Sequence, residues 1–386
     1  MFILKVLFVI NNFYAKGNGL SGSARRTVKH LQERGLDVKV LSGKNPDVNG
    51  LKPDFELENF SIPIFNNLVE RQGYVFAKND YKIIEDAVKW ADVIHLEEPF
   101  ILQNKVCKVA KKYKKTLVGT YHLHPENLFA SVNLERDFNL NTSTLILWRN
   151  TVFNKCKILQ CPTENVKERL LRHHFKPELR VISNGIKQSD FTTTEVEPIR
   201  VSDAKYQVIT IGRHSVEKDP ITLLKSMKYS KFRNDIQLVF AGRGPKTKSL
   251  AKYADKLYKK GIIKYKPLFC FYSISELQSL AKGSDLYIHL AFIEVEGLSC
   301  MEAIQTGLVP LIAEYKYSAT SQFALNEKSK FKARNPKDLA EKIDYWLEDD
   351  ERRKAEAKKY LSMKNDYDID DSIDKIIEMY NDALKM

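Results

Sequence analysis

Cysteine is scarce in this chain and follows no pattern. The 386 residues include five cysteines, without a CxxC pair or a zinc-ligand spacing. A small, odd number of scattered thiols argues against a disulfide framework and favours a protein that works in the reducing cytoplasm. The same scatter excludes the common structural zinc sites.

Long hydrophobic runs are also missing. No apolar stretch approaches the roughly 20 residues that a helix needs to span a bilayer. The apolar start, residues 1–10, is too short for a signal peptide and is typical of a first buried strand. We therefore expect a cytoplasmic protein whose contact with a membrane, if any, is peripheral, on the inner face of the cell membrane.

Two motifs that would assign a function at once are absent. Gly17, Gly19 and Gly22 follow the first predicted strand, but the helix context and the downstream acidic residue of a dinucleotide fingerprint do not follow them. This removes the main support for a Rossmann dehydrogenase. No recognisable nucleic-acid-binding motif is found either, although the chain is basic.

The charge is strongly one-sided, with a formal net charge of +13. Residues 101–176 hold 14 Lys and Arg against 5 Asp and Glu. This positive charge has three interpretations: binding of nucleic acid, binding to an anionic membrane surface, or solubility alone. The predicted strands are those of a buried α/β sheet, which disfavours nucleic acid, and we favour an anionic membrane surface over simple solvation.

The chain alternates strand and helix patterns in two series, which predicts an α/β protein with parallel sheets covered by helices. The predicted elements include a helix at 81–90, strands at 158–161 and 262–265, and a loop at 266–272. At 386 residues two domains are expected. We place the first at residues 1–188 and the second at 196–365, joined by a polar linker. An amphipathic helix at about 370–384, within a segment 366–386, is expected to cross back to the first domain.

One stretch of the second series places two carboxylates around a helix start. Glu294 lies in the loop after an apolar strand pattern, and Glu302 lies in the helix predicted for Leu298–Thr306, which Gly307 ends. Ligands bind at such strand ends, and free N–H groups at a helix start hold phosphate. The alternative is that Glu294 is an ordinary loop charge and Glu302 faces solvent.

A second motif supplies cations. The strand predicted for 207–211 ends in Gly212-Arg213, and Lys218 follows at the start of another helical pattern. Arginine offers a planar fork to phosphate oxygens and lysine a mobile charge. Both would lie at the carboxyl edge of the same sheet, so the pattern indicates a diphosphate site.

These two motifs, about 76 residues apart (294 minus 218), resemble the signature of retaining glycosyltransferases with the GT-B fold. The resemblance implies two Rossmann-like domains facing across a cleft, with the C-terminal helix crossing back to the first. It extends over nearly the whole chain through further segments: Gly17–Gly19, Gly119–His122, Ser183–Gly185 and Ala241–Pro245. Within the family, residues 121–126 and 318–327 are similar to bacterial cholesterol α-glucosyltransferases and diacylglycerol glucosyltransferases.

The resemblance also implies roles for individual residues. Catalytic residues would be Arg213 and Lys218 on the leaving diphosphate, Glu294 on the sugar hydroxyls and His122 on the sugar from the first domain. The remaining implied donor contacts are the ribose-binding Glu302 and five others: Gly19, Asn184, Gly212, Gly297 and Leu298. One departure concerns residues 266–272, which lack the glycine expected where the family commonly contacts the nucleotide base.

The implied reaction transfers a hexose from a nucleotide sugar, with UDP-glucose as the favoured donor, to a membrane lipid or sterol. No metal or other cofactor is expected, because the two cations take its place. His122, His124 and Glu126 are an alternative metal set, which Pro125 disfavours by interrupting the extended run. The apolar residues 127–150, predicted as helix and loop, would line a path for a lipid acceptor.

Three rival functions stay open on the sequence alone. A transferase that builds surface polysaccharide or protein glycans would use the same donor site with a carbohydrate acceptor. A nucleotide-sugar-binding protein without activity would keep the fold, although the four charged residues of the two motifs argue against it. A nucleic-acid-binding protein would be marked by a steep salt dependence of binding.

Overall fold

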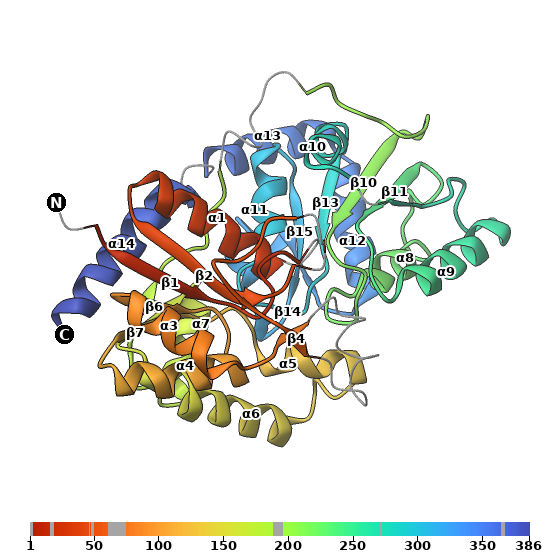
Figure 1. Ribbon diagram of the computed structural model, residues 1–386. Coiled ribbons are helices and arrows are strands. Elements are labelled where there is room, and N and C mark those ends of the chain that lie inside the picture. The colour runs from red at the N-terminus through yellow and green to blue at the C-terminus, as the bar shows by residue number, and fades with distance from the viewer. Residues whose placement is uncertain are drawn as a thin grey trace. The chain divides into compact units, whose positions relative to one another are not determined.

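The computed structural model describes residues 3–15, 19–45, 47, 50–60, 75–187, 196–270, 272–363 and 367–386. The chain divides into two compact units, one of residues 1–185 with 369–386 and the other of residues 186–368. Both are α/β structures built on a parallel sheet, as Figure 1 shows. The predicted fold class is confirmed.

The first unit has a seven-stranded parallel sheet in the order β3-β2-β1-β6-β7-β8-β9. The central strands are buried on both faces, which explains their continuous apolar sequence. The strands are β1 (Lys5–Val9), β2 (Asp37–Gly43), β3 (Phe55–Leu57), β6 (Val93–Leu96), β7 (Thr116–Thr120), β8 (Ile158–Cys161) and β9 (Glu178–Val181). The first unit also has a separate two-stranded antiparallel sheet, formed by β4 (Asn59–Phe60) and β5 (Phe76–Ala77).

The helices of the first unit include three whose first turns are capped by polar side chains. Asp80, Asp137 and Thr163 each accept backbone N–H bonds at a helix start. The helices are α1 (Gly19–Glu33), α3 (Tyr81–Trp90), α4 (Ile101–Lys112), α5 (Pro125–Phe129), α6 (Phe138–Thr151), α7 (Glu164–Arg172) and α14 (Ile369–Lys385).

Helix α14 belongs to the first unit although it closes the chain. Its apolar stripe, which includes Ile373, Ile376 and Tyr380, joins the buried cluster formed by β1, β2 and α1. Arg34, directly after α1, also pairs with Asp370 and Asp374. This C-terminal helix of 17 residues therefore completes the core of the domain in which the chain begins.

The second unit has a six-stranded parallel sheet in the order β12-β11-β10-β13-β15-β17. The strands are β10 (Tyr206–Ile211), β11 (Ile236–Ala241), β12 (Leu268–Cys270), β13 (Leu286–His289), β15 (Pro310–Glu314) and β17 (Lys330–Lys332), with a small pair of β14 (Ile293–Glu294) and β16 (Tyr317–Ser318). From β10 the sheet continues through β11 and β12 on one side, and from β13 it continues through β15 and β17 on the other. These two neighbours therefore flank the switch point, where open α/β sheets bind ligands.

Six α-helices and two 3-10 helices are described around this second sheet. They are α8 (Pro220–Ser226), α9 (Thr247–Lys259), α10 (Ile274–Lys282), α11 (Leu298–Gln305), α12 (Pro336–Leu347), α13 (Asp350–Ser362), η5 (Ala319–Phe323) and η6 (Glu327–Ser329). A single apolar cluster beneath them includes Val208, Phe240 and Ile288. No helix among the described residues is long and apolar enough to cross a membrane.

The strand predicted at 262–265 is wrong. That segment forms turns after α9, and the strand lies later, at β12 (Leu268–Cys270), inside the predicted loop. Ile263 is nonetheless buried, because the turn folds it onto the core. An apolar pair that is buried from a turn has the same local pattern as a short buried strand.

Candidate active site

The two sequence motifs of the second unit meet at the switch point of its sheet. Strand β10 pairs with β13, so the loop that carries Arg213 and the loop that carries Glu294 leave the same edge. A backbone bond of 3.0 Å from the Phe292 N–H to the Glu217 carbonyl ties the loops together. Two segments 76 residues apart (294 minus 218) thus form one site.

The loop after β10 depends on two glycines. Gly212 and Gly242 adopt φ values of 150° and 151°, which favour glycine. A Cβ on Gly242 would lie 1.9 Å from the Gly212 carbonyl oxygen. The loops after β10 and β11 therefore pack backbone against backbone, which sets the position from which Arg213 leaves the sheet.

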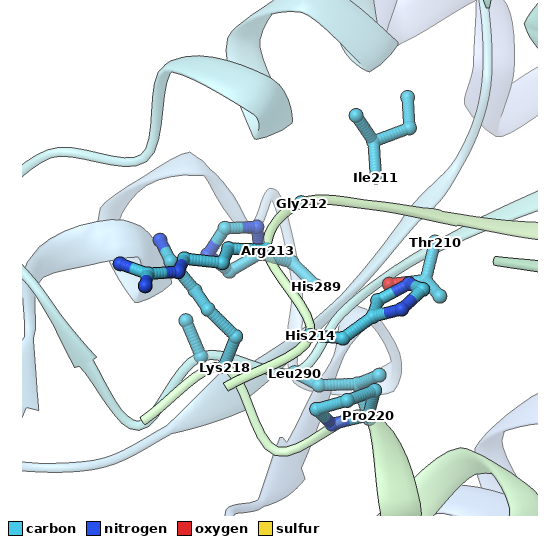
Figure 2. Close-up of a pocket in the computed structure, with 10 residues that line it drawn as sticks. Thr210, Ile211, Gly212, Arg213, His214, Lys218, Pro220, His289 and Leu290 are labelled. Atoms are coloured by element: carbon cyan, nitrogen blue, oxygen red, sulfur yellow. The ribbon is translucent and has the colours of Figure 1, made fainter. Parts of the chain in front are cut away.

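Lys218 and Glu294 form an ion pair across the two loops. Both side chains are half-buried, at 29% and 18% exposure, so the pair is screened less than a surface pair. Figure 2 shows Arg213 and Lys218 extending toward the same side of the loop. Three of the four predicted catalytic residues therefore lie in this unit, at one strand edge.

A small pocket lies at this edge. It is lined by Arg213 and Lys218 together with Thr210, Ile211, Gly212, His214, Pro220, His289, Leu290 and Ala291. Burial lowers the pKa of the Arg213 guanidinium, and the Glu217 carboxylate opposes the shift. A desolvated guanidinium gains from an anionic ligand, because phosphate oxygens replace the lost hydration.

Sequence reasoning missed His214 and His289. His289, at the end of β13, hydrogen-bonds through Nδ1 to Tyr287 Oη (2.9 Å) and through Nε2 to Thr320 Oγ1 (3.2 Å). Its Nε2 lies 3.8 Å from Glu294 Oε2. Burial lowers the pKa of His289 to about 4, so the ring is neutral beside the carboxylate. A polar residue at the carboxyl end of a strand was the available signal.

Gly297 and Leu298 lie at the start of α11, as predicted. Gly297 has φ of 96°, and a Cβ there would lie 2.7 Å from Thr320 Oγ1, so only glycine fits beside that hydroxyl. Leu298 packs against the core. Glu302 lies on the same helix, partly exposed, and is not among the residues that line the pocket.

The other predicted residues lie in the first unit. His122 follows β7, is 7% exposed and bonds through Nε2 to Glu97 Oε2 at 2.8 Å. Gly19 is the first residue of α1, and a Cβ there would meet open space; Gly17 lies outside the described residues. Asn184 is buried just after β9.

The alternative metal set around His122 has other partners. Glu126 accepts two hydrogen bonds from Arg169, at 2.8 and 3.0 Å. His124 Nδ1 lies 3.1 Å from Tyr121 Oη, and burial holds the pKa of His124 well below its ordinary value. No group of three metal-ligating side chains occurs in the part of the chain that the structure describes.

Two family models match this chain in succession. Residues 17–189 match Glycosyltransferase Family 4, and residues 192–361 match Glycosyl transferases group 1. Together the matches extend over most of the chain. This protein is a GT-B glycosyltransferase. The resemblance to GT-B glycosyltransferases that was drawn from the two motifs is confirmed, and the retaining mechanism stays a prediction.

Two curated relatives of this glycosyltransferase differ in their sugars. The alpha-monoglucosyldiacylglycerol synthase of Streptococcus pneumoniae is 23% identical over 80% of this chain and 71% of its own length. The GDP-mannose-dependent alpha-mannosyltransferase of Corynebacterium glutamicum is 24% identical over 80% of this chain and 72% of its own.

Two solved structures are also similar to this glycosyltransferase. Anabaena HepE, crystallised with UDP and glucose, superposes with a TM-score of 0.71 over 98% of this chain and 99% of its own, at 15% identity. This likeness supports the fold. The catalytic domain of Helicobacter pylori cholesterol-alpha-glucosyltransferase is 37% identical over 42% of this chain and 99% of its own, with a TM-score of 0.38.

Proposed function

We propose that this glycosyltransferase moves a hexose, with glucose from UDP-glucose as the favoured donor, to a hydroxyl of a membrane lipid or sterol with retention of configuration. The observation that carries the donor half is the cluster of Arg213, Lys218 and Glu294 at the switch point of the second sheet. It combines two cations for a diphosphate with a carboxylate for sugar hydroxyls.

The cations serve the step in which the bond between the sugar and the diphosphate breaks. Negative charge then grows on the diphosphate, and fixed cations stabilise it more than they stabilise the intact donor. In the absence of donor, Lys218 pairs with Glu294, so both charges are held at the site beforehand. The acceptor oxygen bonds to the sugar from the same face, and its proton leaves with the diphosphate.

The acceptor half rests on a surface of the first unit made by α4 and α6. Ile101, Lys105, Lys108 and Lys112 follow one exposed face of α4. Beside it in Figure 1 lies α6, and Phe100 at the start of α4 contacts Trp148 of α6 at 5.9 Å between ring centroids. The α4–α6 surface is defined here by these two helices and the turn before α6.

The α4–α6 surface exposes large apolar side chains on α6 and the turn before it, as well as the lysines of α4. Phe138 and Leu147 are 67% and 58% exposed, and Leu134 and Ile146 join them. Clustered exposed apolar groups mark an interaction site, and their pairing with basic residues is typical of proteins that lie on an anionic membrane. The curated relative from Streptococcus pneumoniae is named for a lipid product, which supports the same choice.

Lys112 and Lys115, at and just after the end of α4, have hydrogen-bond or ion-pair partners within the protein. Lys112 pairs with Glu85 at 2.9 Å, and Lys115 donates to the carbonyls of Lys89 and Ala91 at 3.0 and 2.6 Å. Their charge is partly committed to packing against α3. The membrane role therefore falls on the exposed lysines of α4, chiefly 105, 108 and 111.

A donor-by-acceptor screen tests the proposal. Purified protein is incubated with UDP-glucose, UDP-galactose or GDP-mannose, and with cholesterol vesicles, diacylglycerol vesicles or soluble oligosaccharides. We expect turnover with UDP-glucose and a vesicle-borne hydroxyl, with an α-linked product by NMR. Transfer to oligosaccharides alone would contradict the lipid acceptor and indicate an enzyme of polysaccharide or glycan synthesis. Donor binding without transfer to any acceptor would indicate a nucleotide-sugar-binding protein without activity.

Glu302→Gln is expected to weaken binding of free UDP by about tenfold, with kcat changed less than threefold, because one charged hydrogen bond to the ribose is worth roughly 1.5–3 kcal/mol. Ribose contacts lie away from the bond that breaks, so they act on affinity. Titration calorimetry with UDP measures the effect. An unchanged affinity would remove Glu302 from the donor site.

Chelation is expected to leave activity unchanged, because Arg213 and Lys218 occupy the place where a divalent ion would neutralise the diphosphate. Rates are compared after dialysis against EDTA and after adding back Mg²⁺ or Mn²⁺. A loss that either metal restores would assign a metal to the donor and contradict the scheme.

A further inference from the structure

His122 is held by a neighbouring strand of its own sheet. Its strand β7 pairs with β6, and Glu97 follows β6 directly. Glu97 Oε2 lies 2.8 Å from His122 Nε2. A carboxylate accepts, so the proton of this bond belongs to Nε2, and Nδ1 is left as the ring nitrogen that can meet a sugar hydroxyl.

Glu97 is a carboxylate buried at 3% exposure. Burial acts to raise its pKa, but the charge and hydrogen bond of His122, together with His95, hold the pKa below the ordinary value. A buried carboxylate is stable only where hydrogen-bond donors surround it. The hydrogen-bond donor is His122, and His95 lies on the other side of the carboxylate, with its Nε2 3.2 Å from Glu97 Oε1.

The proton positions around His95 follow from its other partners. Gln160 donates its amide N–H to the Ile182 carbonyl (3.0 Å), which leaves its amide oxygen to accept from Thr120 Oγ1 (2.8 Å). Thr120 has then used its single proton. In the bond of 2.7 Å between His95 Nε2 and Thr120 Oγ1, the donor is therefore the His95 Nε2–H group. The same nitrogen lies on the side of the ring nearest Glu97.

The other nitrogen of His95 completes the chain of bonds. Its Nδ1 lies 2.7 Å from Tyr380 Oη and, in the neutral ring, accepts from that hydroxyl. Burial lowers the pKa of His95 to about 4 and raises that of Tyr380 above its ordinary value, so both stay in these forms at neutral pH. Tyr380 comes from α14, at the other end of the chain.

We infer that Glu97 is a positioning residue for His122, and that His95 and Tyr380 fix Glu97 in turn. Glu97 sets the tautomer of His122, so that Nδ1 is the ring nitrogen that can accept a hydrogen bond from a sugar hydroxyl. The last helix thereby supports the catalytic histidine. This inference rests on the proposed role of His122 in sugar transfer.

The test combines Glu97→Gln, His122→Ala and the double variant. Glutamine keeps the shape of glutamate but replaces one carboxylate oxygen by an amide NH2 group, so the hydrogen bond that fixes the tautomer of His122 is weakened or lost. We expect each single variant to lose roughly tenfold to a hundredfold in kcat/KM, as misplaced catalytic groups do. The double variant should be no slower than His122→Ala, because Glu97 acts through His122.

Ring ¹⁵N chemical shifts give a readout that needs no turnover. In the unchanged protein His122 should show a protonated Nε2 and an unprotonated Nδ1, and Glu97→Gln should mix the two tautomers. Fully additive kinetic losses, or a His122 ring unaffected by Glu97→Gln, would overturn the inference. If no donor is turned over, the proposed function fails while the NMR result still decides the positioning.

Tyr380→Phe isolates the contribution of α14. It removes the hydroxyl that fixes His95, so we expect the tautomer of His95 to change and kcat/KM to fall roughly threefold to tenfold. Tyr360→Phe is the matched control, since Tyr360 is equally buried in the second unit and its hydroxyl accepts from the Leu325 N–H at 3.0 Å. Unchanged His95 and His122 signals in Tyr380→Phe would remove the last helix from the scheme.

Discussion

Arg213→Ala and Lys218→Ala are each expected to lower kcat and kcat/KM together by about a hundredfold, which corresponds to roughly 3 kcal/mol of lost transition-state stabilisation. Both parameters fall because the charge on the diphosphate grows as the sugar leaves. Initial rates at varied UDP-glucose concentration measure them. A rate near that of the unchanged protein in either variant would remove that residue from the site.

The ion pair makes the two variants differ in one respect. Lys218→Ala leaves Glu294 without the ammonium group, whereas Arg213→Ala leaves the pair in place. Lys218→Ala combined with Glu294→Ala should therefore lose less than the sum of the two single variants, because the pair shares one interaction. Lys248→Ala, at an exposed position on α9, is the control for removing a lysine from the same unit and should be fully active.

Replacing Lys105, Lys108 and Lys111 together by Glu is expected to weaken binding to anionic vesicles by more than about a hundredfold at low salt. Each lysine near an anionic surface contributes about 1 kcal/mol, and the introduced carboxylates add repulsion. Activity on vesicle-borne lipid should fall in parallel, while activity on a soluble acceptor stays within about twofold. Vesicle co-sedimentation and the two rates are the measurements.

A matched triple variant controls for net charge. Lys248, Lys252 and Lys256 lie exposed on α9, and their replacement by Glu gives the same charge change in the other unit. This variant should still sediment with anionic vesicles and release at high salt. Equal loss of binding in both triple variants would show a general charge effect and contradict a membrane role of the α4–α6 surface.

Local sequence patterns were enough to predict the class of the protein and the extent of many elements. Strand 158–161 and helix 81–90 were predicted with the bounds that the structure has, because an apolar period and a polar cap fix them locally. The charged motifs indicated a diphosphate site for the same reason, since a glycine turn followed by cations has few other uses. The family comparison confirmed the glycosyltransferase family, whereas the diphosphate site stays a prediction.

The assembly of the site was decided by tertiary structure. Strand β10 lies beside β13 although β11 and β12 follow it in the chain, and only this order brings Lys218 to Glu294. Strand order depends on packing between distant segments, which no local period records. His214 and His289 were missed because a lone histidine has no pattern until its neighbours in space are known.

The sequence by itself determined the α/β alternation, the family and the charged residues of the proposed donor site, because these depend on neighbours along the chain. The tertiary structure decided which charged side chains face solvent and which bind partners within the protein. It gave Lys112 and Lys115 partners on or beside α3, and it joined His95 to Tyr380, 285 residues away. Burial and hydrogen bonding between distant segments exist only once the chain has folded, so their effect on charge and tautomer cannot be predicted from local sequence.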